Sequence, residues 1–257
     1  MSLSTSTIKY IRSLHQKKFR QNYNKFIVEG DKLARECLQQ QYFPIEGLFA
    51  TESWLVAHGD TLRLAPEKIE EVGPAMLGRI SQLSTPNEVL LVVEQRKYEL
   101  RTGFPEGRQV LYLDKIADPG NFGTILRIAD WFGMGPVLYS PDCVEPYNPK
   151  VVQASMGAIF RVPFVEMELD VLKEQYPDLY IAGTDMKGES IYAFQPPAAG
   201  VMVIGSEHHG IRETYRPLLD TVVSIPGDAA GGAESLNAAV ATGIVCAFLH
   251  SRKERHM

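Results

Sequence analysis

The chain has 257 residues, of which 45% are apolar and 22% charged, and its net charge is −5. This length suits one large domain or a small domain beside a larger one, and the composition permits a sizeable core. The sequence has no apolar run of about 18 residues that predicts a membrane span, and its N-terminus lacks the apolar stretch of a signal peptide.

The basic residues are concentrated at the N-terminus. Residues 1–28 hold six lysines and arginines and no acid, which leaves −11 on the other 229 residues. A basic end on an acidic chain indicates a surface for a polyanion, and we expect Lys17, Lys18 and Arg20 to bind its anionic groups. The alternative is that "TIKYIRSLHQKKFR" is only the solvated face of a helix.

The rest of residues 1–98 is typical of a small α/β domain. "KFIVEG", "IEGLFAT" and "EVLLVVEQ" have strand character, and "DKLARECLQQQ" predicts a helix with Asp31 in its first turn. A polar stretch with two glycines and a proline follows, and we expect a linker at 99–108.

Residues 109–257 alternate between short apolar runs and helical segments. The expected strands are "VLYLD", "PVLYS", "RVPFVEM", "LYIAGT", "GVMVIG" and "TVVSIP". The expected helices are "FGTILRIADWFG", "NPKVVQASMGA", "LDVLKEQY" and "SLNAAVATGIVCAFLHSRK". This alternation predicts a parallel sheet with both faces covered, whose ligands bind in the loops beyond the carboxyl ends of the strands. The loops after Asp114, Gly205 and Pro226 are therefore the candidate sites.

The first of these loops leads into a helix that carries one arginine. In "DPGNFGTILR", Pro119 and Gly120 predict a turn, and Asn121 is a candidate cap for the helix. Arg127 lies on the same helix face as Gly123, where a fixed cation can hold an anion. The alternative for Arg127 is an ordinary surface salt bridge.

The other two loops are rich in glycine. In "VIGSEHHGIRE", Gly205 and Gly210 suit a backbone that approaches a ligand closely, so we expect a bound ligand to exclude any side chain at Gly205. His208 and His209 are adjacent, so their side chains diverge, and no third metal ligand is evident. In "IPGDAAGGAESLNAAVA", Ser235 is placed to begin a helix as a plain N-cap, and Asn237 could fix a neighbouring loop.

Three cysteines, Cys37, Cys143 and Cys246, lie far apart and share no metal-ligand spacing. We expect free thiols, no bound metal and a cytoplasmic protein. The dinucleotide-binding, P-loop and nucleophile-elbow motifs are all missing from the sequence.

Taken together, "DPGNFGTILRIADWFG", "VIGSEHHGI" and "IPGDAAGGAESLNAAVA" resemble the three motifs of the SpoU-type (TrmH-like) ribose 2'-O-methyltransferases of the SPOUT superfamily. The resemblance covers about residues 108–250, and "KKFRQNYNKFIVEGDKLARECL" is similar to the N-terminal substrate-binding domain of the rRNA branch. It implies an α/β fold: a knotted parallel-sheet SPOUT domain (a trefoil knot) at 109–257, after a smaller α/β RNA-binding domain at 1–98. It also implies a homodimer and a reaction that methylates a ribose 2'-hydroxyl of RNA from S-adenosylmethionine.

The resemblance also assigns roles to residues. The family's catalytic and acceptor-site positions match Arg127, Asn121, Glu207, Ser235 and Asn237. Its cofactor-binding positions match Thr184, Gly205, Gly210, Ile225 and Leu236. Arginine is a poor proton acceptor, so we expect Arg127 to stabilise the developing alkoxide and orient a phosphate, with phosphate-assisted proton removal as the alternative.

Two departures from the family pattern bear on these roles. The stretch from Ile225 to Ser235 spans ten positions where the family usually has eight, which leaves open where the cofactor-binding backbone lies. The pair His208 and His209 stands where small or basic residues are common. The chain is expected to act on rRNA, and the alternatives are a tRNA 2'-O-methyltransferase or an RNA-binding relative without activity.

Overall fold

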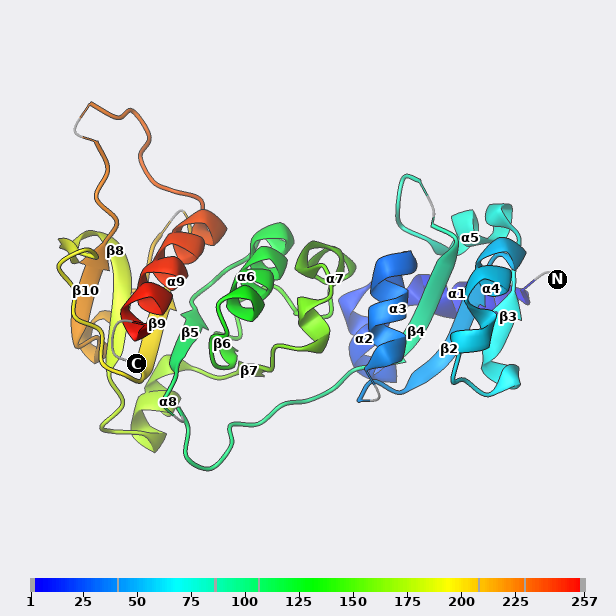
Figure 1. Cartoon of the computed structure of the whole chain (residues 1–257), viewed down its shortest axis with the longest axis horizontal. Helices are drawn as coiled ribbons and strands as arrows, with labels where there is room; N and C mark the ends of the chain where they lie inside the picture. The colour runs from blue at the N-terminus through cyan, green and yellow to red at the C-terminus, as the bar shows by residue number, and fades with distance from the viewer. Residues whose placement is uncertain are drawn as a thin grey trace. The chain divides into compact units, whose positions relative to one another are not determined.

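The computed structural model describes residues 3–40, 42–85, 87–105, 107–207, 209–228 and 230–254. The chain divides into two compact units, 1–96 with 147–160 and 97–146 with 161–257. Each unit contains one sheet and is described by itself (Figure 1). In the described part of the chain, no helix is long and apolar enough to cross a membrane.

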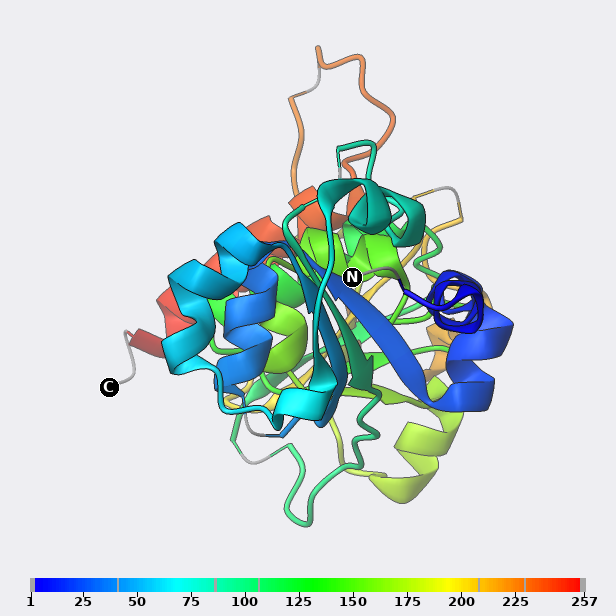
Figure 2. The same ribbon diagram turned by 90° about the vertical axis from the view of Figure 1, so that its right-hand side faces the viewer.

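The first unit is built on a four-stranded sheet in the order β1-β4-β2-β3. Its strands are β1 (Lys25–Glu29), β2 (Ile45–Ala50), β3 (Ile69–Glu71) and β4 (Val89–Glu94). Its helices are α1 (Thr5–Ser13), α2 (Lys17–Tyr23), α3 (Asp31–Gln39), α4 (Glu52–His58), α5 (Pro74–Ile80) and α7 (Pro149–Ser155), with short 3-10 turns at Gly59–Thr61, Pro66–Lys68 and Ala158–Phe160. Figure 2 shows α1 and α2 on one side of the sheet and α3 and α4 on the other.

The basic helix expected from "TIKYIRSLHQKKFR" is two helices. The α1 helix ends at Ser13, whose hydroxyl donates to the Tyr10 carbonyl, and α2 begins at Lys17. Ile8 and Ile11 of α1 are buried in one apolar cluster with residues of α5 and the sheet. The break lets both helices pack on the unit with their basic residues at or near the surface, apart from one buried arginine.

The second unit is an all-parallel six-stranded sheet in the order β10-β8-β9-β5-β6-β7, as the alternating pattern predicts. Its strands are β5 (Gln109–Leu113), β6 (Val137–Tyr139), β7 (Phe164–Glu166), β8 (Ile181–Ser190), β9 (Gly200–Ile204) and β10 (Thr221–Ser224). Its helices are α6 (Pro119–Trp131), α8 (Leu169–Gln175) and α9 (Ala238–Glu254), with a 3-10 turn at Arg216–Leu218.

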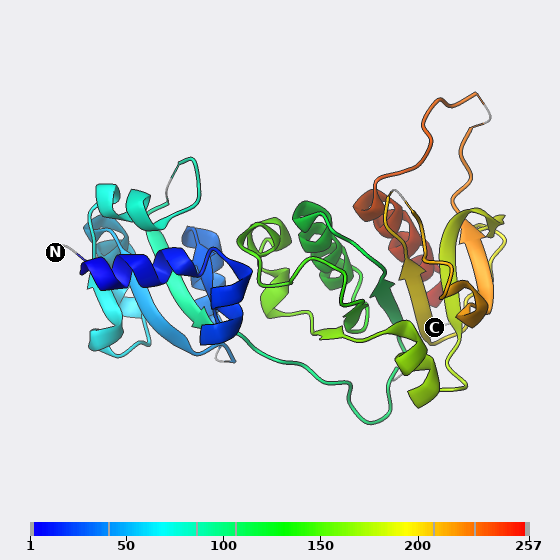
Figure 3. The same cartoon turned by 180° about the vertical axis from the view of Figure 1, so that it is seen from behind.

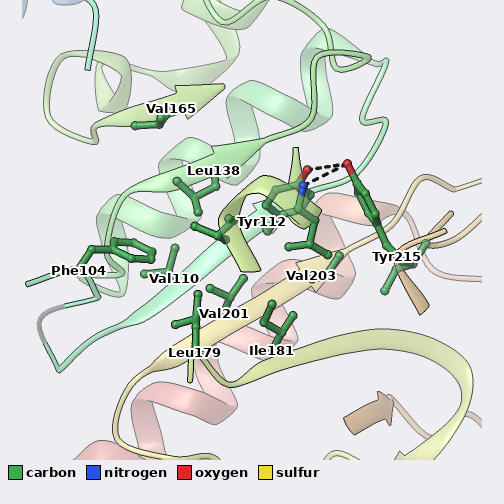
Figure 4. Close-up of a cluster of buried hydrophobic side chains, with 13 residues drawn as sticks. Phe104, Val110, Tyr112, Leu138, Val165, Leu179, Ile181, Val201, Val203 and Tyr215 are labelled. Atoms are coloured by element: carbon green, nitrogen blue, oxygen red, sulfur yellow. Dashed lines mark hydrogen bonds between the residues drawn. The ribbon is translucent and has the colours of Figure 1, made fainter. Parts of the chain in front are cut away.

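Side chains of the central strands alternate between two buried faces. Val110 and Tyr112 of β5 join Val201 and Val203 of β9 in a cluster with α8, drawn in Figure 4. Seen from behind, α8 lies in front of this sheet, while α6 and α9 lie on its far side (Figure 3). Because the first strand of the unit is central, the loops after β5 and β9 leave the same edge of the sheet side by side, which is where ligands of such sheets bind.

The α6 and α9 helices pack against each other. Ile128 of α6 lies beside Gly243 of α9, where an added Cβ atom would be 3.7 Å from the isoleucine Cδ1. The small residue allows this close packing. Both helices begin at the carboxyl edge of the sheet, so their first turns face the candidate site.

Candidate active site

Asp118, rather than Asn121, caps α6. Its Oδ1 accepts a hydrogen bond of 2.8 Å from the Asn121 backbone N–H, and Pro119 occupies the first helical position. The prediction that Asn121 is the cap is wrong, because Asp118 stands three residues earlier, at the spacing that a capping side chain requires. The Asp-Pro pair is a recognisable signal for a helix start. The capping by Asp118 leaves the Asn121 side chain available for other contacts.

The Asn121 side chain joins the three loops. Its Nδ2 donates to Glu207 Oε1 in the loop after β9, and its Oδ1 accepts from Asn237 Nδ2 at 2.9 Å. These partners are 86 and 116 residues away along the chain. Loops that the sequence shows only as separate candidates therefore meet at one amide group, and the prediction that Asn237 fixes a neighbouring loop is confirmed.

The network has one consistent direction. A carboxylate only accepts hydrogen bonds, so the Asn121 amide N–H must point to Glu207 and its oxygen to Asn237. The Asn237 oxygen in turn accepts from the backbone N–H groups of Ala239 and Val240, at 3.0 and 3.2 Å. The chain of amides thus ends on the free N–H groups at the start of α9 and fixes the orientation of both asparagine side chains.

Asn237 is the cap of α9, and Ser235 is not. The helix begins at Ala238, three residues later than the sequence predicts. Ser235 and Leu236 lie in the preceding loop, where the described residues from Pro226 to Asn237 are all exposed and Leu236 has 44% of its surface accessible. Figure 1 shows this loop extending away from the sheet between β10 and α9.

Arg127 is exposed on α6 and has no ion pair or hydrogen bond with any described residue. The alternative of a surface salt bridge therefore finds no support in the described part of the chain. Arg127 lies six residues after Asn121, about 9 Å along the helix axis, but helical side chains tilt toward the N-terminal end. This tilt allows a long guanidinium side chain to extend back toward that end of α6.

The main chain of the loop after β9 folds back against Gly205. Ser206 and Gly210 form an antiparallel bridge, and a Cβ atom on Gly205 would lie only 2.2 Å from the Gly210 carbonyl carbon and 2.4 Å from the Ile211 nitrogen. The main chain of the loop already excludes a side chain at Gly205, and the close approach of a bound ligand there stays a prediction. Gly210 has a φ of +63°, which favours glycine.

The predicted cofactor residues lie along one edge of the sheet, apart from Leu236. Thr184 Oγ1 donates to the Val203 carbonyl of β9, and Gly205 follows that strand directly. Between Val222 and Val223 of β10 the pairing jumps from Gly183 to Glu189, so the intervening residues of β8 leave the ladder at this edge. Main-chain groups and the half-buried side chains of Thr184 and Ile225 therefore lie at this edge of the sheet.

Of the predicted RNA-binding residues, two are exposed and one is not. Lys17 and Lys18 are exposed at the start of α2, whereas Arg20 has only 2% of its surface accessible. Its Nη1 donates to the Leu14 carbonyl at the end of α1, 2.9 Å away. Arg20 therefore links the two helices, and its predicted contact with phosphate is corrected. The remaining exposed cations of α1 are Lys9 and Arg12.

The histidine pair gives no support for a metal site. His209 is exposed and its backbone N–H donates to Ser206 Oγ, whereas His208 lies outside the described residues. Within the described ranges, no group of three or more histidine, cysteine, aspartate and glutamate side chains could hold an ion.

The three cysteines are free and buried. Burial raises the pKa of each thiol, to about 12 for Cys37 and Cys246 and to about 11 for Cys143. They stay protonated at neutral pH and behave as small apolar groups rather than nucleophiles.

Family models match both parts of the chain. Residues 108–247 match the SpoU rRNA methylase family, and residues 5–91 match the MRM3-like substrate binding domain. Together these matches cover both sheets.

Individual relatives match over nearly the whole chain. The 23S rRNA (guanosine(2553)-2'-O)-methyltransferase RlmP of Bacillus subtilis is 28% identical over 249 residues, which are 95% of this chain and 96% of the relative. A solved structure of a TrmH-family protein from Porphyromonas gingivalis is 32% identical, with a TM-score of 0.85 over 98% of this chain and 100% of that one. The S-adenosylmethionine-bound rRNA methyltransferase of Sinorhizobium meliloti is 28% identical, with a TM-score of 0.83 over 100% of this chain and 97% of that one.

Proposed function

Because the chain belongs to the SpoU rRNA methylase family, we propose that it transfers a methyl group from S-adenosylmethionine to a ribose 2'-hydroxyl of rRNA. RlmP, which is similar over its full length, is a 23S rRNA 2'-O-methyltransferase, and this supports rRNA as the substrate. The structural relative from Sinorhizobium meliloti was solved with S-adenosylmethionine bound, which supports the cofactor. We also propose the family's trefoil knot for the second unit and a cytoplasmic location, which suits three buried free thiols.

The observation that carries the proposal is the amide network beside an unpaired arginine. Asn121, Glu207 and Asn237 come from three loops and are locked in one orientation, which defines an acceptor site at the edge of the sheet. Arg127 lies on the same helix as Asn121, exposed and with its charge unpaired by any described residue. A chain that only bound RNA would have no need to converge these three loops on one point.

The chemistry assigned to these side chains follows from their charge. The cofactor would supply an electrophilic methyl group and leave as its neutral thioether, while the ribose hydroxyl gives its proton to solvent water and its oxygen gains negative charge. An arginine keeps its positive charge and donates up to five hydrogen bonds, so Arg127 can stabilise that oxygen and hold the adjacent phosphate. Glu207, held by Asn121, and Ser235 in the exposed loop would border the acceptor nucleotide.

Titration calorimetry with S-adenosylmethionine in the absence of RNA tests the proposal. We expect one cofactor molecule to bind per chain. A chain that binds RNA but does not bind S-adenosylmethionine would be an RNA-binding relative without activity, and the proposed reaction would have to be abandoned.

The exposed cations of α1 and α2 are proposed to bind RNA phosphates. Replacing Arg12, Lys17 and Lys18 by serine removes three charges without disturbing the buried Arg20. RNA affinity should fall, and its dependence on salt should flatten by about 0.7 to 0.9 log units per log of salt for each phosphate that is no longer bound. Binding of S-adenosylmethionine should stay unchanged, since its proposed pocket lies in the other unit.

A matched control removes charge elsewhere in the same unit. Lys32 and Arg63 are also exposed, and replacing both by serine should leave the salt slope near that of the parent. If the α1–α2 variant showed the parent's affinity and slope, those cations would be no more than a solvated helix face.

We further propose that the chain forms a homodimer through the exposed sides of α6 and α9. Three large apolar side chains are exposed along these helices: Trp131 ends α6 with 84% of its surface accessible, Leu236 precedes α9, and Val240 lies in the first turn of α9. Such side chains on a small protein mark an interaction surface. Trp131→Glu should therefore give a monomer in analytical ultracentrifugation, whereas Val56→Glu, at an exposed apolar residue of α4, should not. A Trp131→Glu variant that sediments as the parent does would rule out this surface.

A further inference from the structure

A buried ion pair joins the end of β5 to the segment that follows the loop after β9. The Asp114 side chain is fully buried at the end of β5, and its two oxygens accept from the Arg212 backbone N–H at 2.8 Å and from Arg212 Nε at 2.7 Å. Arg212 Nη2 is also 2.6 Å from Asp114 Oδ1. The residues are 98 positions apart in the chain, so no local pattern in the sequence pointed to them.

Further groups enclose the guanidinium, whose side chain is only 17% exposed. Carboxylates of Asp142 and Glu168 lie 3.2 and 3.5 Å from its nitrogens, and the Tyr215 ring lies under it with 4.4 Å to the ring centroid. Burial and a hydrogen bond to Glu168 raise the pKa of Tyr215 to about 12, so its phenol stays protonated and donates to that carboxylate. Tyr215 also lies beside Tyr112 of the central strand, as Figure 4 shows.

The ion pair joins the two segments on which the amide network depends. Asp114 directly precedes the loop that leads to Asn121, and its backbone N–H donates to the Ile204 carbonyl at the end of β9. Arg212 directly follows the loop that runs from Gly205 through Glu207 to Ile211. The hydrogen bond between Asn121 and Glu207 requires these two loops to keep a fixed separation, and the Asp114–Arg212 pair spans their bases.

The energetic cost of burying these charges argues for such a role. Removing two charges from water is expensive, and a buried ion pair is often no more stabilising than apolar residues of the same volume. What a carboxylate held by both the guanidinium and the backbone N–H of one arginine does supply is a fixed geometry, since its two oxygens are bound by different groups of the same residue. Here that geometry fixes the loop that carries Glu207 and the proposed cofactor-binding backbone.

We propose that Arg212 is a positioning residue: through Asp114 it holds the loop 205–211 in the conformation that binds S-adenosylmethionine and presents Glu207 to Asn121. The inference rests on the proposed function for its cofactor, but the restraint on the loop is a property of the chain alone. Arg212 itself does not touch the reacting atoms in this account.

The experiment compares Arg212→Gln with Arg161→Gln by hydrogen exchange and calorimetry. Arg161 forms a similar two-nitrogen pair with Asp130 in the same unit, at 3.0 and 2.8 Å, and is a matched control. In Arg212→Gln, amide exchange should accelerate within 205–211 in the free protein. Its affinity for S-adenosylmethionine should fall about tenfold to a hundredfold, the range for losing a charge-assisted hydrogen bond. Arg161→Gln should change neither.

A double variant separates positioning from general stability. Asp114→Asn combined with Arg212→Gln removes the unpaired buried charge, so its melting temperature should recover toward that of the parent. Because the guanidinium–carboxylate contact is not restored, cofactor affinity should stay low and amide exchange in 205–207 and 209–211 fast. If affinity recovered together with the melting temperature, Arg212 would be only a stabilising residue and the proposal would be wrong.

The outcomes also distinguish this inference from the proposed function. A parent protein that does not bind S-adenosylmethionine contradicts the proposed function, and the exchange comparison still decides whether Arg212 restrains the loop. A parent that binds the cofactor, with an Arg212→Gln variant that matches it in affinity and exchange, contradicts this inference alone.

Discussion

Arg127→Ala should slow methyl transfer about a hundred- to a thousandfold, the usual loss when one preorganised electrostatic group is removed from an active site. Affinity for S-adenosylmethionine should hardly change, because the proposed cofactor residues lie on the ends of β8, β9 and β10 and not on α6. Single-turnover rates with saturating RNA measure the chemical step, and calorimetry measures the cofactor.

Two variants on the same helix sharpen the test. Arg127→Lys keeps the charge but lacks the planar fork that holds a phosphate through two bonds, so its rate should fall between those of the parent and the alanine variant. Thr124→Ala changes an exposed residue one turn earlier on α6 and should react at nearly the parent rate. Near-normal turnover by Arg127→Ala would remove Arg127 from the mechanism.

Asn121→Asp should be the second most damaging change at neutral pH. The new oxygen keeps the acceptor for Asn237 but loses the donor to Glu207, so two carboxylates face each other where a hydrogen bond was. Losing the charged hydrogen bond and adding the repulsion should together slow transfer about a hundredfold or more. The melting temperature should fall as well, since the network joins three loops.

The pH dependence of the methyl-transfer rate shows whether repulsion between the two carboxylates causes the loss in Asn121→Asp. Two adjacent carboxyl groups retain a proton at higher pH than an isolated one, and this proton recreates a donor between them. The ratio of the variant's rate to the parent's should therefore rise as the pH is lowered from about 8 toward 5. Asn121→Ala, which lacks the added charge, should give a ratio that is flat with pH. Equal, flat ratios for both variants would mean that the bond to Glu207 is not what Asn121 contributes.

The sequence predicts the second unit far better than the first. Its six strands and its three helices all appear, because buried parallel strands read as continuous apolar runs and long helices as periodic ones. The fourth expected helix also forms, as α7, but it belongs to the first unit. In the first unit, the sequence does not predict the helices α4 and α5 or the strand β3. These elements are short, three to seven residues, so their patterns are too brief to recognise.

For the site, sequence reasoning finds the loops but not the contacts within them. Motif resemblance selects Asn121, Glu207 and Asn237, yet only the fold shows that one amide joins all three. Sequence reasoning also selects a residue that the fold buries. Arg20 belongs to a basic run, yet it donates to the Leu14 carbonyl inside the unit, because the run forms two helices and not one. The Asp114–Arg212 pair is set by the pairing of β5 with β9, which is a property of the sheet rather than of any local stretch.

The most direct test of the central claim uses rRNA from a strain that lacks this protein. That RNA is treated with the purified chain and S-adenosylmethionine, and methylated positions are mapped by mass spectrometry of the digested RNA. The account predicts a new 2'-O-methylated ribose in rRNA that the Arg127→Ala protein fails to produce. A methyl group on a base, methylation of tRNA alone, or unchanged rRNA after treatment with the parent protein would contradict it.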